Sequence, residues 1–180
     1  MTIRDSAPGN LALIERFLRT RHEVVDAASL SAWLAQEGLA ASAPQGLAKR
    51  VIWLREALRE LMWANNGGPA APGALKTLNA EAKRVGLGVR ASARGTPVYV
   101  WKAGRGEQVV APILAAVLAA MADGSWNRMK ACAAEDCRYA FYDHTKNRSG
   151  RWCDVAGCGV NFRMRQYRRR LAPRARVSDS

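Results

Sequence analysis

Cysteine is missing from the first 131 residues of this 180-residue chain. All four cysteines follow, as Cys132-x4-Cys137, fifteen intervening residues and Cys153-x4-Cys158. Two close pairs suit a tetrahedral ion, because each pair can place two thiolates on one tight turn. The pattern predicts one structural Zn²⁺ held by all four thiolates. The alternatives are two disulfides or four unrelated thiols, and a chain of this size can build a core without disulfides.

A long apolar run is also missing. The longest, Val109–Ala122, has fourteen residues, fewer than the roughly 20 that a helix needs to cross a bilayer. The segment Met1–Gly9 is polar and mixed in charge, unlike the apolar part of a secretory signal. We therefore expect a cytoplasmic protein without membrane contact. With 49% apolar residues, the chain can form one domain and a small appendage.

Signals of catalysis are equally scarce. The two histidines, His22 and His144, lie outside any recognisable nucleophile or metal motif, and the sequence has no phosphate-cradling glycine loop or serine elbow. A catalytic zinc usually keeps an open coordination position, whereas four cysteines close the shell. We do not expect an enzyme.

Acidic residues are few toward the C-terminus. The net charge is +13, and residues 127–180 carry 13 Lys/Arg against 5 Asp/Glu. Residues 161–176 contain seven arginines and no acid. Such a positive segment beside a metal site favours a polyanion as partner, and nucleic acid is the commonest one. The alternative is that the arginines only keep the protein in solution.

Apolar residues at helical spacing predict five helices before the cysteines, over residues 10–21, 29–37, 45–64, 75–85 and 107–122. Ser29 is the expected cap of the second helix. In the third, Arg55, Glu56, Arg59 and Glu60 are expected to face outward. The fifth is apolar nearly all round and is expected at the centre of the helical layer. Period-two alternation over 87–101 predicts a β-hairpin. Residues 1–126 are thus predicted to form a mainly α domain with one hairpin.

Residues 127–172 are predicted to form a small four-cysteine zinc-finger module of the treble-clef-like kind: a knuckle, a β-hairpin and a basic helix. The expected hairpin joins Tyr139–Asp143 to Arg151-Trp152 through a polar turn. After Cys158, apolar residues at steps of four, three and four predict a helix that starts at the metal site. The tail, residues 173–180, is expected to be disordered.

The other face of this helix is rich in arginine, whose guanidinium can bind phosphate or the edge of guanine in a duplex. The predicted nucleic-acid contacts are Lys146, Asn147, Arg148, Arg151, Asn161, Arg163, Arg165, Gln166, Arg168, Arg169 and Arg170. A solvated helix face is the alternative. Binding of RNA is another, because aromatic residues lie near the cysteines; these suit the small core of the module better. A thiolate-based redox or metal sensor is a third.

The motif residues resemble the bacterial CGNR zinc-finger proteins, a family described as stress-induced transcription regulators. The resemblance rests on the following residues: Cys132-Ala-Ala-Glu-Asp-Cys137, Phe141-Tyr-Asp143, Lys146-Asn-Arg148, Arg151-Trp-Cys153, Cys158-Gly159 and Tyr167-Arg-Arg-Arg170. The family signature Cys-Gly-Asn-Arg reads Cys158-Gly159-Val160-Asn161 here. We therefore expect phosphate contacts to dominate over sequence preference.

The N-terminal part resembles the helical partner domain of that family, called ABATE. It does so at Thr20-Arg21-His22, Leu30-Ser-Ala-Trp33-Leu34, Leu54-Arg-Glu-Ala-Leu-Arg59, Leu78-Asn79 and Ala111-Pro112-Ile113. Arg19 stands where the family has an asparagine. The resemblance implies a transcription regulator whose finger binds DNA. Its helical domain would sense a signal, which leaves room for a small-molecule ligand, or form a homodimer.

Overall fold

Helices form most of the part of the chain that the computed structural model describes, residues 6–39, 43–44, 46–102, 104 and 107–171. The α-helices are α1 (Leu11–Arg19), α2 (Ala27–Gln36), α3 (Leu47–Ala64), α4 (Pro72–Arg84), α5 (Glu107–Ala122) and α6 (Val160–Leu171). The strands are β1 (Gly88–Ala91), β2 (Pro97–Val100), β3 (Met129–Ala131) and β4 (Ala140–Tyr142). Short 3-10 helices cover Thr20–His22 and Ser125–Arg128. The predicted mainly α fold is confirmed, and the predicted tail, 173–180, lies outside the described residues.

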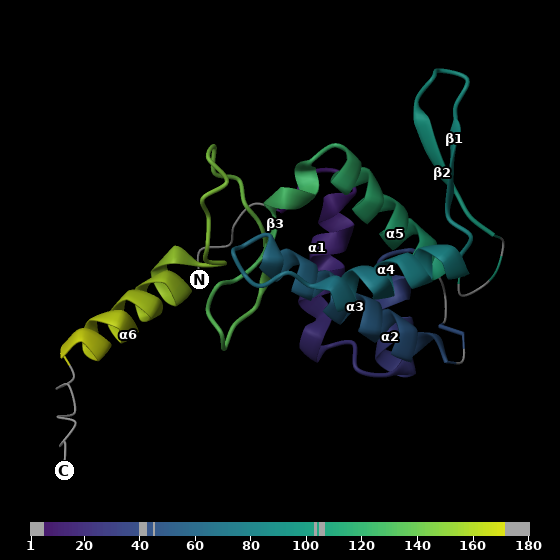
Figure 1. The fold of residues 1–180 in the computed structure, drawn as a ribbon. Helices are drawn as coiled ribbons and strands as arrows, with labels where there is room; N and C mark the ends of the chain where they lie inside the picture. Colours follow the sequence, from purple (N-terminus) through teal and green to yellow (C-terminus); the bar gives the residue numbers. More distant parts are fainter. Residues whose placement is uncertain (1–5, 40–42, 45, 103, 105–106, 172–180) are drawn as a thin grey trace, which may run out of the picture.

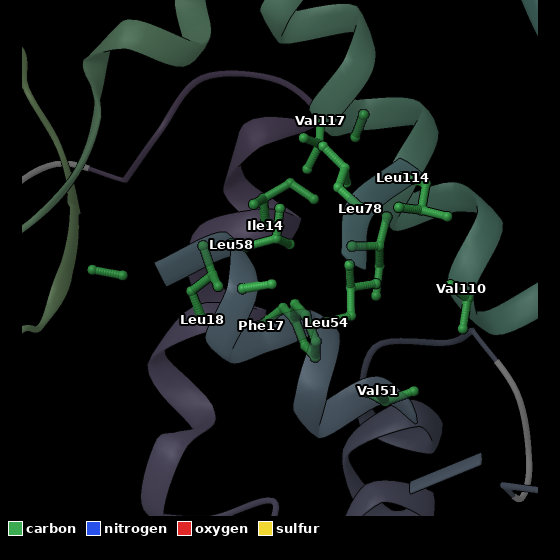
Figure 2. Packing of buried hydrophobic residues seen from close by; sticks show 14 of the residues in the cluster. Ile14, Phe17, Leu18, Val51, Leu54, Leu58, Leu78, Val110, Leu114 and Val117 are labelled. Atoms are coloured by element: carbon green, nitrogen blue, oxygen red, sulfur yellow. The ribbon is translucent and has the colours of Figure 1, made fainter. Parts of the chain in front are cut away.

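One hydrophobic core lies between α1, α3, α4 and α5 (Figure 2). Its labelled members are Ile14, Phe17 and Leu18 of α1, Val51, Leu54 and Leu58 of α3, Leu78 of α4, and Val110, Leu114 and Val117 of α5. Most neighbours in each set stand three or four positions apart, so each helix turns one face inward. Each fully buried aliphatic side chain stabilises the fold by about 1.5–3 kcal/mol.

The position of α5 is less central than its composition predicts. Its inner face is fully buried, whereas the partly or fully exposed Ala115, Ala119 and Ala122 line an open groove on the other side. Small side chains on that side leave room for a hollow instead of filling it, so α5 borders the helical layer.

The N-cap of the second helix lies three residues earlier than predicted. Asp26 is its N-cap: the Asp26 carboxylate accepts from the Ser29 amide at 2.8 Å, and the Ser29 hydroxyl accepts from the Asp26 amide at 3.1 Å. Ser29 is therefore the third helical residue of a reciprocal capping box and not the cap itself. Gly38, with φ of 67°, follows the helix in the left-handed conformation, as expected for a helix stop.

Two arginines predicted to face solvent are buried instead. Arg55 and Arg59 are only 3% and 7% exposed. The Arg55 guanidinium donates to the Thr20 and Val24 carbonyls at 3.0 and 2.8 Å, and Arg59 donates to the Leu18 carbonyl at 3.0 Å. The last carbonyls of a helix have no partner within it. The arginines of α3 satisfy such carbonyls at and beyond the end of α1, which a charge pattern cannot reveal.

The predicted hairpin over 87–101 is present, and β1 and β2 form a projecting β-hairpin arm. β1 pairs antiparallel with β2, with Gly88 opposite Val100 and Ala91 opposite Pro97. The arm extends from the helical layer into solvent (Figure 1). Val89 and Val98 are 60% and 45% exposed, so these apolar side chains have little cover.

The second hairpin differs from the prediction. β4 pairs antiparallel with β3, which precedes the first cysteine, and not with Arg151-Trp152. The first cysteine pair therefore sits in the turn between the two strands. Met129 and Ala131 of β3 join the core of the helical layer, so pairing on this side buries apolar surface that the predicted pairing would leave outside.

Contacts cross the predicted boundary at residues 126/127. β3 packs against α3 and β4 against α1, and the Glu15 carboxylate of α1 accepts from the Tyr142 amide at 3.2 Å. Whether residues 1–126 fold alone stays a prediction. Among the described residues, no helix combines the length and the apolar character that crossing a bilayer requires.

Candidate metal centre and basic surface

The four cysteine sulfurs lie within 4.8 Å of one another. Cys132 and Cys137 come from the turn between β3 and β4. Cys153 comes from the loop that follows, and Cys158 from a π-helical turn, Val155–Gly159, that leads directly into α6. Cys132 and Cys153 are buried, while the other two are partly exposed at the edge. The fold thus gathers all four predicted ligands.

Hydrogen bonds from backbone amides shape both cysteine pairs. The Cys132 amide donates to the Tyr139 carbonyl at 2.9 Å, and the Cys137 amide donates to the Ala134 carbonyl at 3.1 Å, which closes the first knuckle. At the second pair, the Asp154 carboxylate accepts from the Ala156 amide at 3.0 Å and so fixes the turn that carries Cys158. Each pair is therefore held by its own local turn.

The spacing of the sulfurs fits a tetrahedral metal ion. The Cys137 and Cys153 sulfurs are 3.6 Å apart, and the Cys153 and Cys158 sulfurs are 3.7 Å apart. Four thiolates at a Zn–S bond length of about 2.3 Å place neighbouring sulfurs roughly 3.8 Å from one another. The donor set is soft and closed, as in a structural site. It is a zinc-finger site that fits one structural Zn²⁺.

The thiols also perturb one another. Hydrogen bonds, from Cys137 first and Cys153 second, lower the pKa of Cys132 to about 2. Burial, followed by the charge of Cys132, raises the pKa of Cys158 to about 12, and the hydrogen bond with Cys132 raises the pKa of Cys153. One thiolate therefore suppresses ionisation of its neighbours, because like charges at contact distance repel. A bound dication removes this repulsion and allows all four to act as ligands.

A small core surrounds the metal site. Phe141 is buried against the cysteines, and Tyr139 and Trp152 pack at its edge. The Trp152 ring lies against the Phe162 ring of α6, with centroids 4.7 Å apart, so the aromatic pair attaches the helix to the module. Tyr142 belongs to the core of the helical layer instead. The aromatic residues near the cysteines thus serve packing, as the sequence predicts.

A buried ion pair lies beneath the loop that carries Lys146 and Arg148. The Lys130 ammonium donates to the Asp143 carboxylate at 2.7 Å, and these residues are 4% and 0% exposed. Lys130 also donates to the Arg148 and Gly150 carbonyls. A side chain at Gly150 would place its Cβ 2.6 Å from the same carboxylate. The pair therefore ties both ends of the loop to the β3–β4 hairpin.

Opposing effects set the pKa of Asp143. Burial alone would raise it, but hydrogen bonds from Lys130 and from the Thr145 hydroxyl and amide outweigh burial and lower the pKa to about 2. The carboxylate is charged under all physiological conditions. Sequence reasoning missed this pair, because a lysine between two apolar residues reads as a solvent-facing position in a strand.

The basic helix α6 leaves the metal site and stands away from the rest of the chain (Figure 1). No residue along its described length is buried. Nearly all the predicted nucleic-acid contacts on the loop and the helix are exposed, with Gln166 partly covered. The apolar side chains of α6 are exposed as well, including Met164 at 46% and Tyr167 at 58%.

One of the predicted nucleic-acid contacts, Arg165, already forms an ion pair within the chain. The Arg165 guanidinium donates to the Asp136 carboxylate at 2.7 Å, and both side chains are more than half exposed. Asn161, Arg165, Gln166 and Arg169 also line a cavity of about 110 Å³ against the first knuckle. The loop residues Lys146 and Arg148 do not line it. Part of the predicted set is therefore brought together on one side of α6.

Comparison with known families matches nearly all of the described chain. The model of the family described as "CGNR zinc finger" matches residues 128–171. The model of the ABATE family, described as "Putative stress-induced transcription regulator", matches residues 11–124. No curated protein matches the sequence. Residues 125–127 separate the two matched stretches.

Proposed function

This chain belongs to the ABATE family and carries a CGNR zinc finger, and from this premise we propose that it is a transcription regulator whose zinc module binds duplex DNA. The observation that carries the proposal is α6, a helix without a buried residue that begins at the metal site. Five arginines lie exposed along it: Arg163, Arg165, Arg168, Arg169 and Arg170. In this proposal the zinc site holds the N-terminal end of the helix, and the exposed remainder of the helix contacts DNA.

Arginine at this density on a free helix suits phosphate contact. An α-helix fits the major groove of B-form DNA, and guanidinium groups bind phosphate oxygens in pairs of hydrogen bonds. The loop of the zinc module adds positive charge to that of the helix, because Lys146, Arg148 and Arg151 are exposed nearby in the chain. Asn161 and Gln166 are the candidates for adenine contacts. Val160 replaces a polar residue of the family signature, so sequence preference is modest.

The packing of the aromatic side chains near the cysteines favours duplex DNA over RNA as the partner. Sequence-specific RNA binding commonly stacks unpaired bases on exposed aromatic rings. Here Phe141 and Tyr142 are buried and Trp152 lies against Phe162. These three rings are engaged in packing, which leaves Tyr167, 58% exposed on α6, as an exposed ring beside the arginines.

The helical part supplies the regulatory input, by sensing a small molecule or by pairing two chains. The feature that supports this role is a groove of about 670 Å³ between α1, β2 and α5. Tyr99, Trp101 and Pro112 line it together with the alanines of α5. Among the described residues that line it there is no lysine or arginine, which suits an apolar ligand or a second chain.

A competition experiment tests the proposal. Fluorescently labelled duplex DNA, bound to the full zinc-loaded chain, is displaced by unlabelled duplex DNA or by structured RNA of equal length and charge. The proposal predicts that duplex DNA competes better. RNA that competes better would support the alternative of an RNA-binding zinc protein, and loss of DNA binding only on thiol oxidation would support the redox sensor.

A further inference from the structure

Two consecutive asparagines follow the end of α3 and reach the zinc module. Asn65 donates through its side-chain amide to the Trp126 and Met129 carbonyls, at 2.9 and 3.0 Å. Asn66 donates to the Ala131 and Arg151 carbonyls, at 2.7 and 2.9 Å. Both hydrogens of each amide group are therefore used. In the sequence the pair reads only as the signal that stops the helix.

The two carbonyls bound by Asn66 lie next to the metal ligands. Ala131 directly precedes Cys132, and Arg151 stands two residues before Cys153. The Arg151 carbonyl also accepts from the Ala133 amide at 2.9 Å. One amide of the helical part thus holds together the two chain segments that enter the two cysteine pairs. Asn66 is 7% exposed, so water does not readily replace it.

We propose that Asn66 is a positioning residue of the zinc site, through which metal affinity is coupled to the folding of the helical part. A tetrahedral site holds both cysteine pairs at a fixed separation, so a group that sets this separation lowers the cost of binding the ion. Groups that orient ligands from outside the coordination shell typically change metal affinity 10- to 100-fold when they are removed. Asn66 does so by fixing the backbone ahead of each pair instead of touching a sulfur.

Such coupling works in both directions. If an intact α3 end raises the affinity for zinc, bound zinc must stabilise α3 by the same factor. Further contacts support this path: Arg59 of α3 donates to the Arg138 carbonyl in the zinc module, and the Arg138 guanidinium lies over the Trp63 ring, 3.3 Å from its centroid. The proposal does not depend on nucleic acid, so it can hold or fail separately from DNA binding.

Asn65 provides the matched control, because it also donates two hydrogen bonds to carbonyls at the same helix end. Those acceptors precede or lie within β3, on only one of the two segments. Full-length Asn66→Ala and Asn65→Ala chains are titrated with zinc against a chromophoric chelator, and each is melted with and without zinc. The cobalt absorption of thiolate ligands is recorded at saturating metal to show that the ligand set is intact.

The expected result is a zinc affinity about 10- to 100-fold lower for Asn66→Ala and close to the wild type for Asn65→Ala, although both lower the melting temperature of the metal-free chain. Equal losses in the two variants, or an unchanged affinity in Asn66→Ala, would overturn the proposal. If Asn66→Ala does not fold, Asn66→Gln, which keeps the amide donors but displaces them by one methylene, takes its place. For the wild type, a helical melting transition that does not move with zinc concentration would also refute the coupling.

Discussion

Asp143 and Lys130 form a buried ion pair beneath the loop that carries Lys146 and Arg148. Removing one partner of such a pair leaves an uncompensated buried charge, which typically costs about 3–5 kcal/mol. We expect Asp143→Asn to lower the unfolding free energy by this order at pH 7, because Lys130 loses its counter-charge. Chemical denaturation of both chains measures the difference.

The pH dependence of that difference follows from the lowered pKa of Asp143. A carboxyl whose folded pKa of about 2 lies below its ordinary value of 3.8 stabilises the fold above that ordinary value and loses this contribution as the pH falls toward 2. The stability curves of wild type and Asp143→Asn should therefore be separated at neutral pH and converge in acid. Both chains are measured without zinc, so that loss of the metal in acid does not enter the comparison. A constant separation would show that the pair is not the cause.

Asp136 competes with any phosphate for Arg165, because the two side chains form an ion pair at the surface. Asp136→Ala should strengthen DNA binding at low salt and steepen its salt dependence by about one unit, as one more arginine becomes available for phosphate. Glu135→Ala is the control, since it removes one negative charge at the neighbouring position in the sequence. If both substitutions act equally, the effect is one of overall charge and not of the Arg165 contact.

At the scale of elements, the cysteine cluster fixes where α6 begins. Metal binding supplies most of the folding free energy of small zinc modules, so any Cys→Ser substitution among the four should abolish zinc binding and unfold the loop and α6. Elemental analysis should give one zinc per wild-type chain and none for the variants. An intact disulfide in the wild-type protein would contradict this assignment.

The helices could be predicted from the sequence because their apolar spacing is long and regular. The third helix, for example, is found almost to the residue, as α3 over Leu47–Ala64. The burial of Arg55 and Arg59 could not be predicted in this way, because their partners are carbonyls near the end of α1, distant in the sequence. Hydrogen bonding to backbone carbonyls leaves no trace in the pattern of side chains.

The strand pairing in the zinc module could not be predicted from the sequence either. β3 and β4 have three residues each, too few to show alternation, and the partner of β4 precedes the first cysteine. The four ligands could be predicted because their spacing alone carries the chemistry. The supporting residues Lys130, Asp143 and Asn66 could not, because each acts through contacts that only the fold creates.

At the scale of the whole molecule, the division into two parts has a testable consequence. A fragment of residues 1–126 should keep its helices, because it holds most of the core, but melt at a lower temperature than the full chain. It lacks Met129, Ala131 and Tyr142, which complete that core. It should not bind DNA. Affinity equal to that of the full chain would place the binding surface on the helical part.

The central claim is that α6 binds DNA through its arginines, and the most direct test is the salt dependence of binding. Each phosphate neutralised on B-form DNA contributes about −0.9 to the slope of log affinity against log salt, so three or four contacts give a slope of roughly −3 to −4. Alanine at Arg163, Arg165, Arg168, Arg169 or Arg170 should each flatten the slope by about one unit if that residue binds a phosphate. Arg90→Ala on the distant β-hairpin arm is the control of equal charge and should leave the slope unchanged. A flat salt response, with unchanged binding in all five variants, would contradict the account and leave α6 a solvated helix.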